Sequence, residues 1–469
     1  MLKMIQEFLL QPEIFVGVIA LSGLFLQKKS FEDIIKGTTK AMIGFMIIRL
    51  GGDFIAKAME PFAQMFQKAF NVEGTLLSIE GVGAIAIGKY GTEISIIMVL
   101  GMLVNLILAK VSRFRYVFVT GHQALYMASM LVIILNAANV KGVFLVLIGS
   151  LTLGTIMVLS PAIVQKYTSK ILKNDSVAMG HFGGFSYLTA AWLGKIYGEN
   201  SKSTEDMKLP KKLSFLRELS VTLCLVLVIM YIIVASAAGK QYIESTLSSG
   251  QNYIVYCISL ALKFTGGFVV ITTGIRWFIN EIVPAIKGIA DTWIPNAKAA
   301  VDCPVVFSYA PNAVMIGFLS SFFAGILSML VMSACNLTII LPGIVAHFFS
   351  GATAGVYGNS TGGRRGAILG GFVNGIYISV FPLFFLKYFG GDTSIKVTFP
   401  DSDIGLVGSF LGDWINRIGI WGTLTIVLGI MVIMVLIPEM IEDRDESPED
   451  GLFHFDREKI LKESKISEK

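Results

Sequence analysis

Charged residues are scarce in this chain. Asp, Glu, Lys and Arg make up only 15% of its 469 residues, whereas hydrophobic residues make up 54% and include 33 Phe. A soluble domain typically has about 25% charged residues. The composition therefore excludes an ordinary soluble globular domain and predicts a protein embedded in a membrane.

Cysteine is also scarce, with four residues that stand far apart in or beside apolar segments. This spacing suggests neither a disulfide framework nor a zinc site. No phosphate-binding loop of the form GxxxxGK[ST] occurs, and the polar loop at 195–217 is too short for a nucleotide-binding domain, so we do not expect ATP to drive this chain directly. We expect no catalytic residue, metal, cofactor or nucleic-acid partner in this chain.

Long apolar runs are the main feature that is present. A run of roughly 17–25 apolar residues is long enough to cross the hydrocarbon core of a bilayer. Eight such runs lie near 92–110, 117–136, 143–164, 219–238, 252–272, 313–335, 366–386 and 418–437, and three shorter or more polar ones near 13–26, 41–51 and 337–357. The sequence therefore predicts an all-α polytopic membrane protein with about eleven transmembrane helices.

Basic residues gather in some of the connections and avoid others. Lys and Arg cluster near 28–40, 110–115, 166–173 and 195–217, which predicts that these loops face the cytoplasm. The connections near 137–141, 240–251 and 387–403 are poor in positive charge, and the last carries Asp392, Asp401 and Asp403, so we expect them outside. This alternation places the N-terminus outside and divides the chain into a membrane domain, 1–438, and a charged cytoplasmic tail, 439–469.

Three segments are too polar for simple spans and too apolar for free loops. They are 74–91, 177–197 and 272–312, and each combines glycine or proline with charged residues. Irregular backbone at membrane depth is tolerated only where it is buried in protein or lines a cavity. We therefore expect re-entrant segments or broken helices here, which offer free backbone groups to a polar ligand.

Two of the four histidines follow glycine in similar contexts, Thr120-Gly121-His122 and Met179-Gly180-His181. A single histidine among apolar residues is more often a core residue than a ligand contact. Together with Asp302, however, the two histidines form a set that suits a polyol or sugar, because imidazole can donate or accept and a carboxylate accepts from hydroxyls. His347 has no such partner and is interpreted as structural.

Glu80 is a further carboxylate in an apolar context, and two interpretations remain open. It could contact a ligand in a re-entrant hairpin, or it could form a structural ion pair with Lys89 or Arg49. The sequence does not decide between them.

The chain resembles the membrane-embedded IIC subunit of the phosphoenolpyruvate-dependent phosphotransferase system (PTS), in the ascorbate-specific branch of the ascorbate and galactitol superfamily. The resemblance covers almost the whole chain. Its most specific part is Ala300-Val301-Asp302-Cys303 followed by Ser308-Tyr309-Ala310-Pro311-Asn312-Ala313-Val314, beside the Thr-Gly-His and Gly-His motifs.

The resemblance implies an EIIC permease subunit in the bacterial plasma membrane, not an enzyme on its own. It implies a homodimer in which a core domain carries the sugar past a scaffold domain in an elevator-type movement. It also implies that cytoplasmic IIB, recharged by IIA, phosphorylates the ascorbate or related sugar that IIC presents. The alternative is a secondary sugar transporter driven by protons or sodium.

For the sugar site we expect direct contacts from His122, His181 and Asp302. Four further residues are expected to form the supporting wall of the site, namely Gln123, Phe182, Ser308 and Asn312. Glu80 is an outer candidate for a ligand contact. The ascorbate-specific branch has glutamines after the second Gly-His, whereas this chain has Phe182 and two glycines. This difference predicts an aromatic surface that stacks against the sugar ring.

Overall fold

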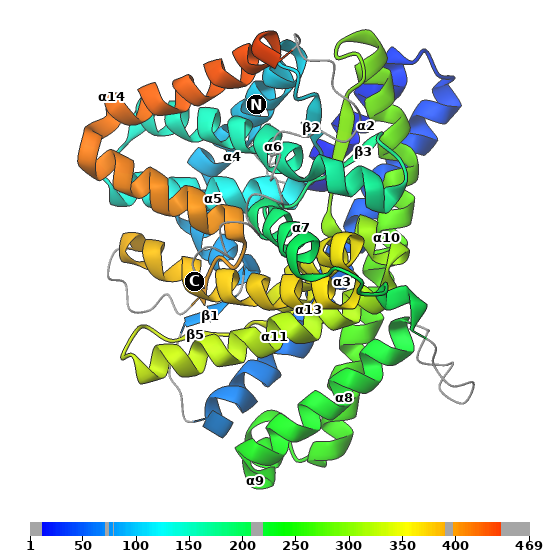
Figure 1. Cartoon of the computed structure of the whole chain (residues 1–469), viewed down its shortest axis with the longest axis vertical. Helices are drawn as coiled ribbons and strands as arrows, with labels where there is room; N and C mark the ends of the chain where they lie inside the picture. Colours follow the sequence, from blue (N-terminus) through cyan, green and yellow to red (C-terminus); the bar gives the residue numbers. More distant parts are fainter. Residues whose placement is uncertain (1–11, 71–74, 78, 208–218, 390–396, 442–469) are drawn as a thin grey trace, which may run out of the picture.

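The structure is a computed structural model, and it describes residues 12–70, 75–77, 79–207, 219–389 and 397–441. Most of this part of the chain is helical (Figure 1). The first half contains α2 (Pro12–Leu26), α3 (Phe31–Phe70), β1 (Thr75–Leu77), α4 (Ile79–Val111), β2 (Tyr116–Phe118), α5 (Gly121–Ala137), α6 (Gly142–Leu172), β3 (Val177–Met179), α7 (Gly184–Tyr197) and the 3-10 turn η1 (Thr204–Asp206).

The second half continues with long helices interrupted by short irregular pieces. Its elements are α8 (Leu219–Ala238), α9 (Lys240–Tyr242), the π-helix η3 (Ile243–Leu247), α10 (Tyr253–Thr292), β4 (Lys298–Val301), η4 (Cys303–Tyr309), α11 (Pro311–Ala334), β5 (Ile340–Leu341), α12 (Ile344–Ala346), the π-helix η5 (His347–Gly351), α13 (Ala352–Phe385), η6 (Leu386–Phe389), β6 (Val397–Thr398) and α14 (Ser402–Ile441).

Six helices in the described residues are long and apolar enough to cross a membrane, or seven if the bent pair 223–238 and 240–247 is one span. The expected eleven spans are therefore not reproduced. Two expected spans are short helices, since α2 has 15 residues and α5 has 17. Another, 41–51, lies inside the 40-residue α3, and 337–357 is divided among β5, α12, η5 and the start of α13.

Two of the long helices are interrupted at glycines. In α13 the backbone leaves the helical conformation at Gly362 and Gly363, and Gly363 has φ +55°. In α14 the interruption is at Gly419, with φ +71°. Positive φ is accessible to glycine because it has no Cβ. Each of these long apolar segments is therefore two helices joined at a bend.

Two small parallel sheets, which the sequence analysis did not predict, connect distant parts of the chain. One has the strand order β5-β1-β6 and the other β2-β4-β3. In the second sheet Phe118 lies opposite Ala300, and Ala300 lies opposite Ala178. The strands are only two to four residues long, so their alternation is too short to separate them from helices.

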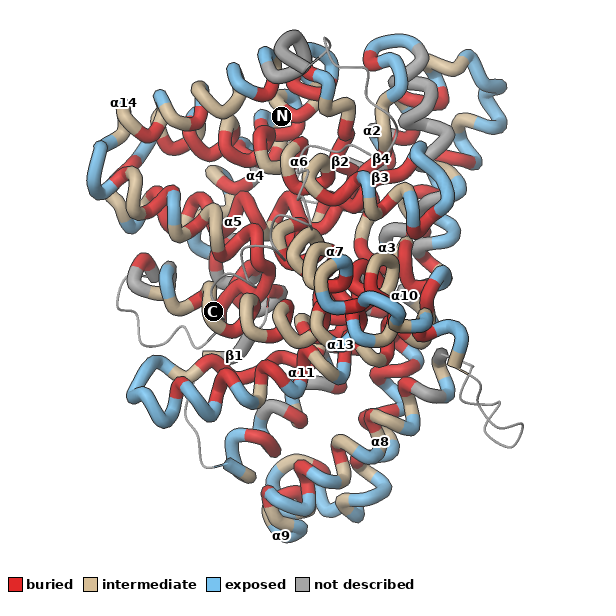
Figure 2. Tube along the Cα trace, viewed as in Figure 1, coloured by how far each residue is buried: buried red, intermediate tan, exposed pale blue. Residues whose placement is uncertain are grey.

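The β2-β4-β3 sheet is buried on both faces (Figure 2). Successive side chains of a strand point to opposite faces. Accordingly, the side chains on one face, from Phe118, Ala178 and Ala300, join a core cluster with residues of α4, α5, α6 and α14. The side chains on the other face join a second cluster with residues of α2, α3, α8, α10, α11 and α13. These are Val117, Val119, Val177, Met179, Ala299 and Val301. The ends of these strands therefore lie where the two clusters meet.

The irregular segments have clear forms in the structure. Residues 177–197 consist of β3, a turn and α7, and the described part of 74–91 consists of β1 and the start of α4, which is kinked at Tyr90. The break expected from residue 272 comes later, because α10 continues to Thr292 and β4 begins at Lys298. Whether these segments are re-entrant stays a prediction. Helix α14 extends to Ile441, and 442–469 of the expected tail lie outside the described residues.

Candidate functional site

The three parallel strands β2, β4 and β3 deliver the predicted site residues to one edge of their sheet. His122 follows β2, His181 follows β3 and Asp302 follows β4 directly. Because the strands are parallel, their carboxyl ends meet at the same edge. Crevices at the carboxyl ends of parallel strands are common places for ligands. The sheet thus explains how residues separated by up to 180 positions come together.

Gly180 allows the chain after β3 to lie against β4. Its backbone N–H donates to the carbonyl of Val301 at 2.6 Å. A Cβ at this position would lie 2.3 Å from the carbonyl oxygen of Ala300 and 2.8 Å from Oγ1 of Thr120. Only glycine permits such a close approach of two backbones. The glycine of the Gly-His motif therefore sets the position of His181.

His122 and Asp302 form a direct polar pair. Nε2 of His122 lies 3.2 Å from Oδ2 of Asp302, and both side chains are partly exposed, at 27% and 20%. The other carboxylate oxygen, Oδ1, accepts from the backbone N–H of Cys303 at 2.8 Å, where it caps η4. Asp302 is thus held in place through one oxygen and presents the other beside an accessible imidazole.

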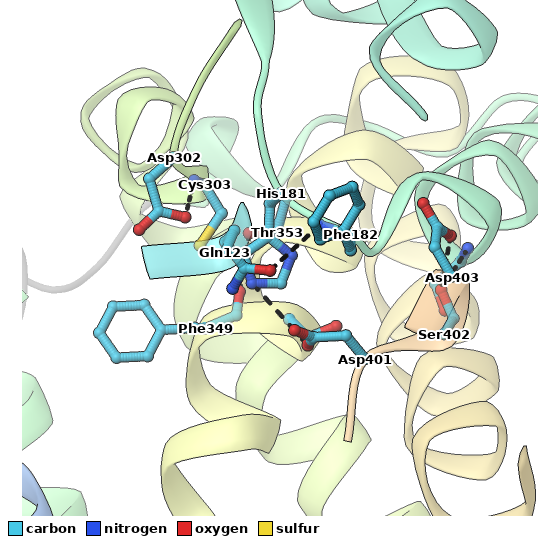
Figure 3. A network of polar contacts seen from close by, with 12 residues as sticks. Gln123, His181, Phe182, Asp302, Cys303, Phe349, Thr353, Asp401, Ser402 and Asp403 are labelled. Carbon is cyan, nitrogen blue, oxygen red and sulfur yellow. Dashed lines mark hydrogen bonds and ion pairs between the residues drawn. The ribbon is translucent and has the colours of Figure 1, made fainter. Parts of the chain in front are cut away.

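His181 is buried, and its ring is fixed from one side. Its Nδ1 lies 2.8 Å from the hydroxyl of Tyr187, which is itself fully buried in α7. Its Nε2 lies 3.8 Å from Oδ1 of Asp401. His181 also belongs to a close group with Asp302 and Cys303, whose ligand atoms lie within 4.8 Å of one another (Figure 3). The structure therefore brings His122, His181 and Asp302 into one site, with Asp302 as the shared member.

The group of His181, Asp302 and Cys303 is the arrangement among the described residues that could hold a metal ion. The same side chains can also donate to or accept from hydroxyl groups. The arrangement can therefore contact hydroxyl groups as well as a metal ion.

Gln123 and Phe182 connect the two Gly-His motifs. Oε1 of Gln123 accepts from the backbone N–H of Phe182 at 3.5 Å, and its side chain also hydrogen-bonds Asp401. The ring of Phe182 is fully buried and stacks on Phe118, with centroids 4.9 Å apart. It therefore has no free face for a sugar ring, and the expectation of an aromatic wall at Phe182 is wrong.

The remaining predicted residues lie less directly at the site. Ser308 is exposed on η4. Asn312 belongs to the start of α11, where its backbone N–H donates to Glu205 at 3.1 Å and its amide donates to the carbonyl of Thr204. These two hydrogen bonds attach the 204–206 turn to the start of α11. The side chain of Glu80 lies outside the described residues, so its two interpretations remain open.

Two aspartates that the sequence analysis assigned to an outward-facing loop are buried beside this site. Asp401 and Asp403 are exposed by only 4% and 6%. Asp401 approaches His181, and Asp403 accepts from the backbone N–H groups of Gly184 and Phe185 at the start of α7. Charge counting placed them in an outward-facing loop. Their position directly before a long apolar helix was the signal that could have indicated a buried role.

The comparison with known families identifies the kind of protein that carries this site. A family model described as "PTS system sugar-specific permease component", EIIC-GAT, matches residues 7–403. The chain belongs to this family. The match covers most of the chain and includes all three strands and the residues that follow them, so the site lies in the part that the family shares. Together with the long apolar helices, it makes this chain a multi-pass membrane protein.

A curated relative is the protein named "Ascorbate-specific PTS system EIIC component" of Mycoplasma pneumoniae. It is 26% identical to this chain, and the match covers 78% of this chain and 63% of the relative. The EIIC-GAT chain thus spans less than two thirds of the relative's length.

Proposed function

We propose that this EIIC-GAT chain binds ascorbate or a related sugar or sugar acid and carries it across the membrane for phosphorylation by a IIB protein. The observation that supports this most directly is the meeting of His122, His181 and Asp302 at the ends of three parallel strands. Such groups recognise hydroxyls by charge-assisted hydrogen bonds. The name of the Mycoplasma relative supports ascorbate as the first ligand to examine.

The proposal includes the partners and the movement that this kind of permease needs. We infer a homodimer in the bacterial plasma membrane, with IIB as the phosphoryl donor and IIA as the protein that recharges it. The site lies where two core clusters meet, and this position supports an elevator-type movement of one part of the chain against the other. Phosphorylation then traps the sugar inside the cell.

The decisive experiment measures uptake of radiolabelled ascorbate, beside a panel of pentoses and sugar acids, in cells that produce this chain with or without IIA and IIB. The phosphorylated product should appear only when both partners are present. The matched control is Asp302→Asn at equal membrane abundance, which should reduce uptake. Free sugar that accumulates without the partners, and is lost on adding an uncoupler, would identify a proton-coupled secondary transporter and contradict the proposal.

A further inference from the structure

Two aspartates stand two positions apart before α14, and both are buried, yet their surroundings differ. Asp403 is surrounded by donors. It accepts from the backbone N–H groups of Gly184 at 3.0 Å and Phe185 at 2.8 Å and from the hydroxyl of Ser160 at 2.5 Å. A carboxylate in this position caps the N-terminus of a helix and complements its dipole. The role of Asp403 is therefore structural, since it fixes α7.

Asp401 lacks such a set of donors. Its Oδ2 is buried and has no hydrogen-bond partner among the described residues. Its Oδ1 lies 3.8 Å from Nε2 of His181, which is too long for a hydrogen bond. Gln123 provides a side-chain hydrogen bond to this carboxylate. A buried carboxylate oxygen without a donor destabilises the fold. The fold itself therefore does not explain why an aspartate is present at this position.

The position of Asp401 suggests what the missing donor is. Figure 3 draws His181 between Asp302 and Asp401. Gln123 hydrogen-bonds Asp401 and accepts from the backbone N–H of Phe182, the residue after His181. The hydroxyl of Tyr187 holds the opposite side of the His181 ring, at Nδ1. His181 therefore has two carboxylates close by, Asp401 near its Nε2 and Asp302 in the group of ligand atoms within 4.8 Å of one another. A ligand that reaches Asp302 and His181 has its next acceptor at Asp401.

We propose that Asp401 is a second substrate-binding carboxylate, whose Oδ2 accepts a hydroxyl of the transported sugar. This inference rests on the proposed function and extends its site beyond the three residues that carry it. The ligand is then a polyhydroxylated molecule with one hydroxyl at His122 and Asp302 and another at Asp401. Since Asp401 is only 4% exposed, this hydrogen bond forms in the state that encloses the sugar.

The test compares Asp401→Asn with the wild-type chain in detergent or nanodiscs. Radiolabelled L-ascorbate, D-xylose and D-arabinose are the ligands, and both affinity and thermal unfolding are measured. We expect Asp401→Asn to bind roughly tenfold to hundredfold more weakly than wild type. Its Tm without sugar should be equal or higher, because the substitution removes a buried charge. Asp403→Asn is the comparison, and it should lower the Tm because it removes a helix cap.

A second measurement assigns the contact to the ligand. Monodeoxy derivatives of the bound sugar are tested against both proteins, as in a double-mutant cycle. The derivative that lacks the hydroxyl bound by Asp401 should bind wild type weakly. Its affinity for Asp401→Asn should be little lower than for wild type, because the hydrogen bond to Asp401 is already absent.

Either of two results would overturn the inference. If wild type binds one of these sugars and Asp401→Asn binds it equally well with a lower Tm, Asp401 is structural and only this inference fails. If wild type binds none of the sugars, the choice of ligand in the proposed function fails, and the inference fails with it.

Discussion

At Asp302 the two carboxylate oxygens have separate tasks. Oδ1 accepts from the backbone N–H of Cys303, whereas Oδ2 faces Nε2 of His122. The first contact needs only a carbonyl-like oxygen, and the second benefits from negative charge. The residue can therefore be changed so that its backbone contact is kept and its role toward a ligand is tested.

We predict that Asp302→Asn weakens sugar binding by about 1.5 to 3 kcal/mol, roughly tenfold to a hundredfold in affinity. The amide retains one acceptor oxygen for the N–H of Cys303 but no longer offers a charged acceptor beside His122. Isothermal titration of the purified protein measures the loss, and its thermal unfolding shows whether the fold is kept. Unchanged affinity in a folded protein would remove Asp302 from the site.

We predict that Gly180→Ala destabilises the fold by about 1 to 3 kcal/mol, because its Cβ would collide with backbone atoms of Ala300 that cannot move independently. Sugar binding should weaken as well, since His181 is displaced. The control is Gly429→Ala in α14, where a Cβ meets nothing within 4 Å. That substitution should leave the Tm equal or slightly higher. A Tm for Gly180→Ala equal to that of the control would contradict this account.

Part of the site could be predicted from single residues and part could not. Histidine is rare in this chain, so two Gly-His motifs and an aspartate in a proline-broken stretch were visible in the sequence. Asp401 was missed because charge patterns describe loops and not the buried contacts of individual carboxylates. Phe182 was assigned to the wrong surface because an aromatic residue next to a site can equally pack behind it, as Phe182 does against Phe118.

At the scale of elements, the long helices were predictable and the short strands were not. Apolar runs near 143–164 and 313–335 correspond to α6 and α11, because burial in a bilayer needs length and apolarity alone. The β2-β4-β3 sheet depends instead on pairing between segments more than 100 residues apart, such as Phe118 with Ala300. No local pattern contains that information.

A polar link outside the membrane spans joins the loop before β3 to the start of β4. Asp175 forms a salt bridge with Lys298 and accepts from Ser169 and Gln165. Burial raises the pKa of the Asp175 carboxyl, but these hydrogen-bonding partners lower it by more. The pKa of Asp175 therefore lies below its ordinary value. A carboxyl with a lowered pKa stabilises the folded state above the unfolded-state pKa, and this contribution is lost as the pH falls through the folded-state value.

We therefore predict that Asp175→Asn lowers the Tm modestly at pH 7. The effect is small because the Asp175 side chain is 65% exposed. The difference from wild type should persist down to about pH 4, near the ordinary pKa of aspartate, and shrink only below it. Unfolding followed across this range measures the dependence. A difference that is constant from pH 7 to pH 3 would show that the charge of Asp175 is not what matters.

At the scale of the whole molecule, two of the basic clusters that the sequence placed on one side lie together. Lys110 packs over the ring of Trp293, and the carbonyl of Arg115 accepts from the backbone N–H of Lys298 at 2.8 Å. Lys298 in turn pairs with Asp175, which follows the basic segment 166–173. The 110–115 and 166–173 segments are therefore joined through the start of β4, although α5 and most of α6 lie between them in the sequence.

The positive-inside rule then predicts which side this end of the sheet faces. We expect an Arg113→Cys variant to react with a membrane-impermeant maleimide only after cells are permeabilised. A Gln251→Cys variant, in the connection that lacks basic clusters, should react in intact cells. Both positions are exposed, and the naturally exposed Cys335 is replaced by serine in each variant. Because the two basic segments are held together by direct contacts, they share one side whatever the orientation. Labelling of Arg113→Cys in intact cells would therefore show that the topology is the reverse of the predicted one. The surface available to the proposed IIB partner would then be on the opposite side of the chain.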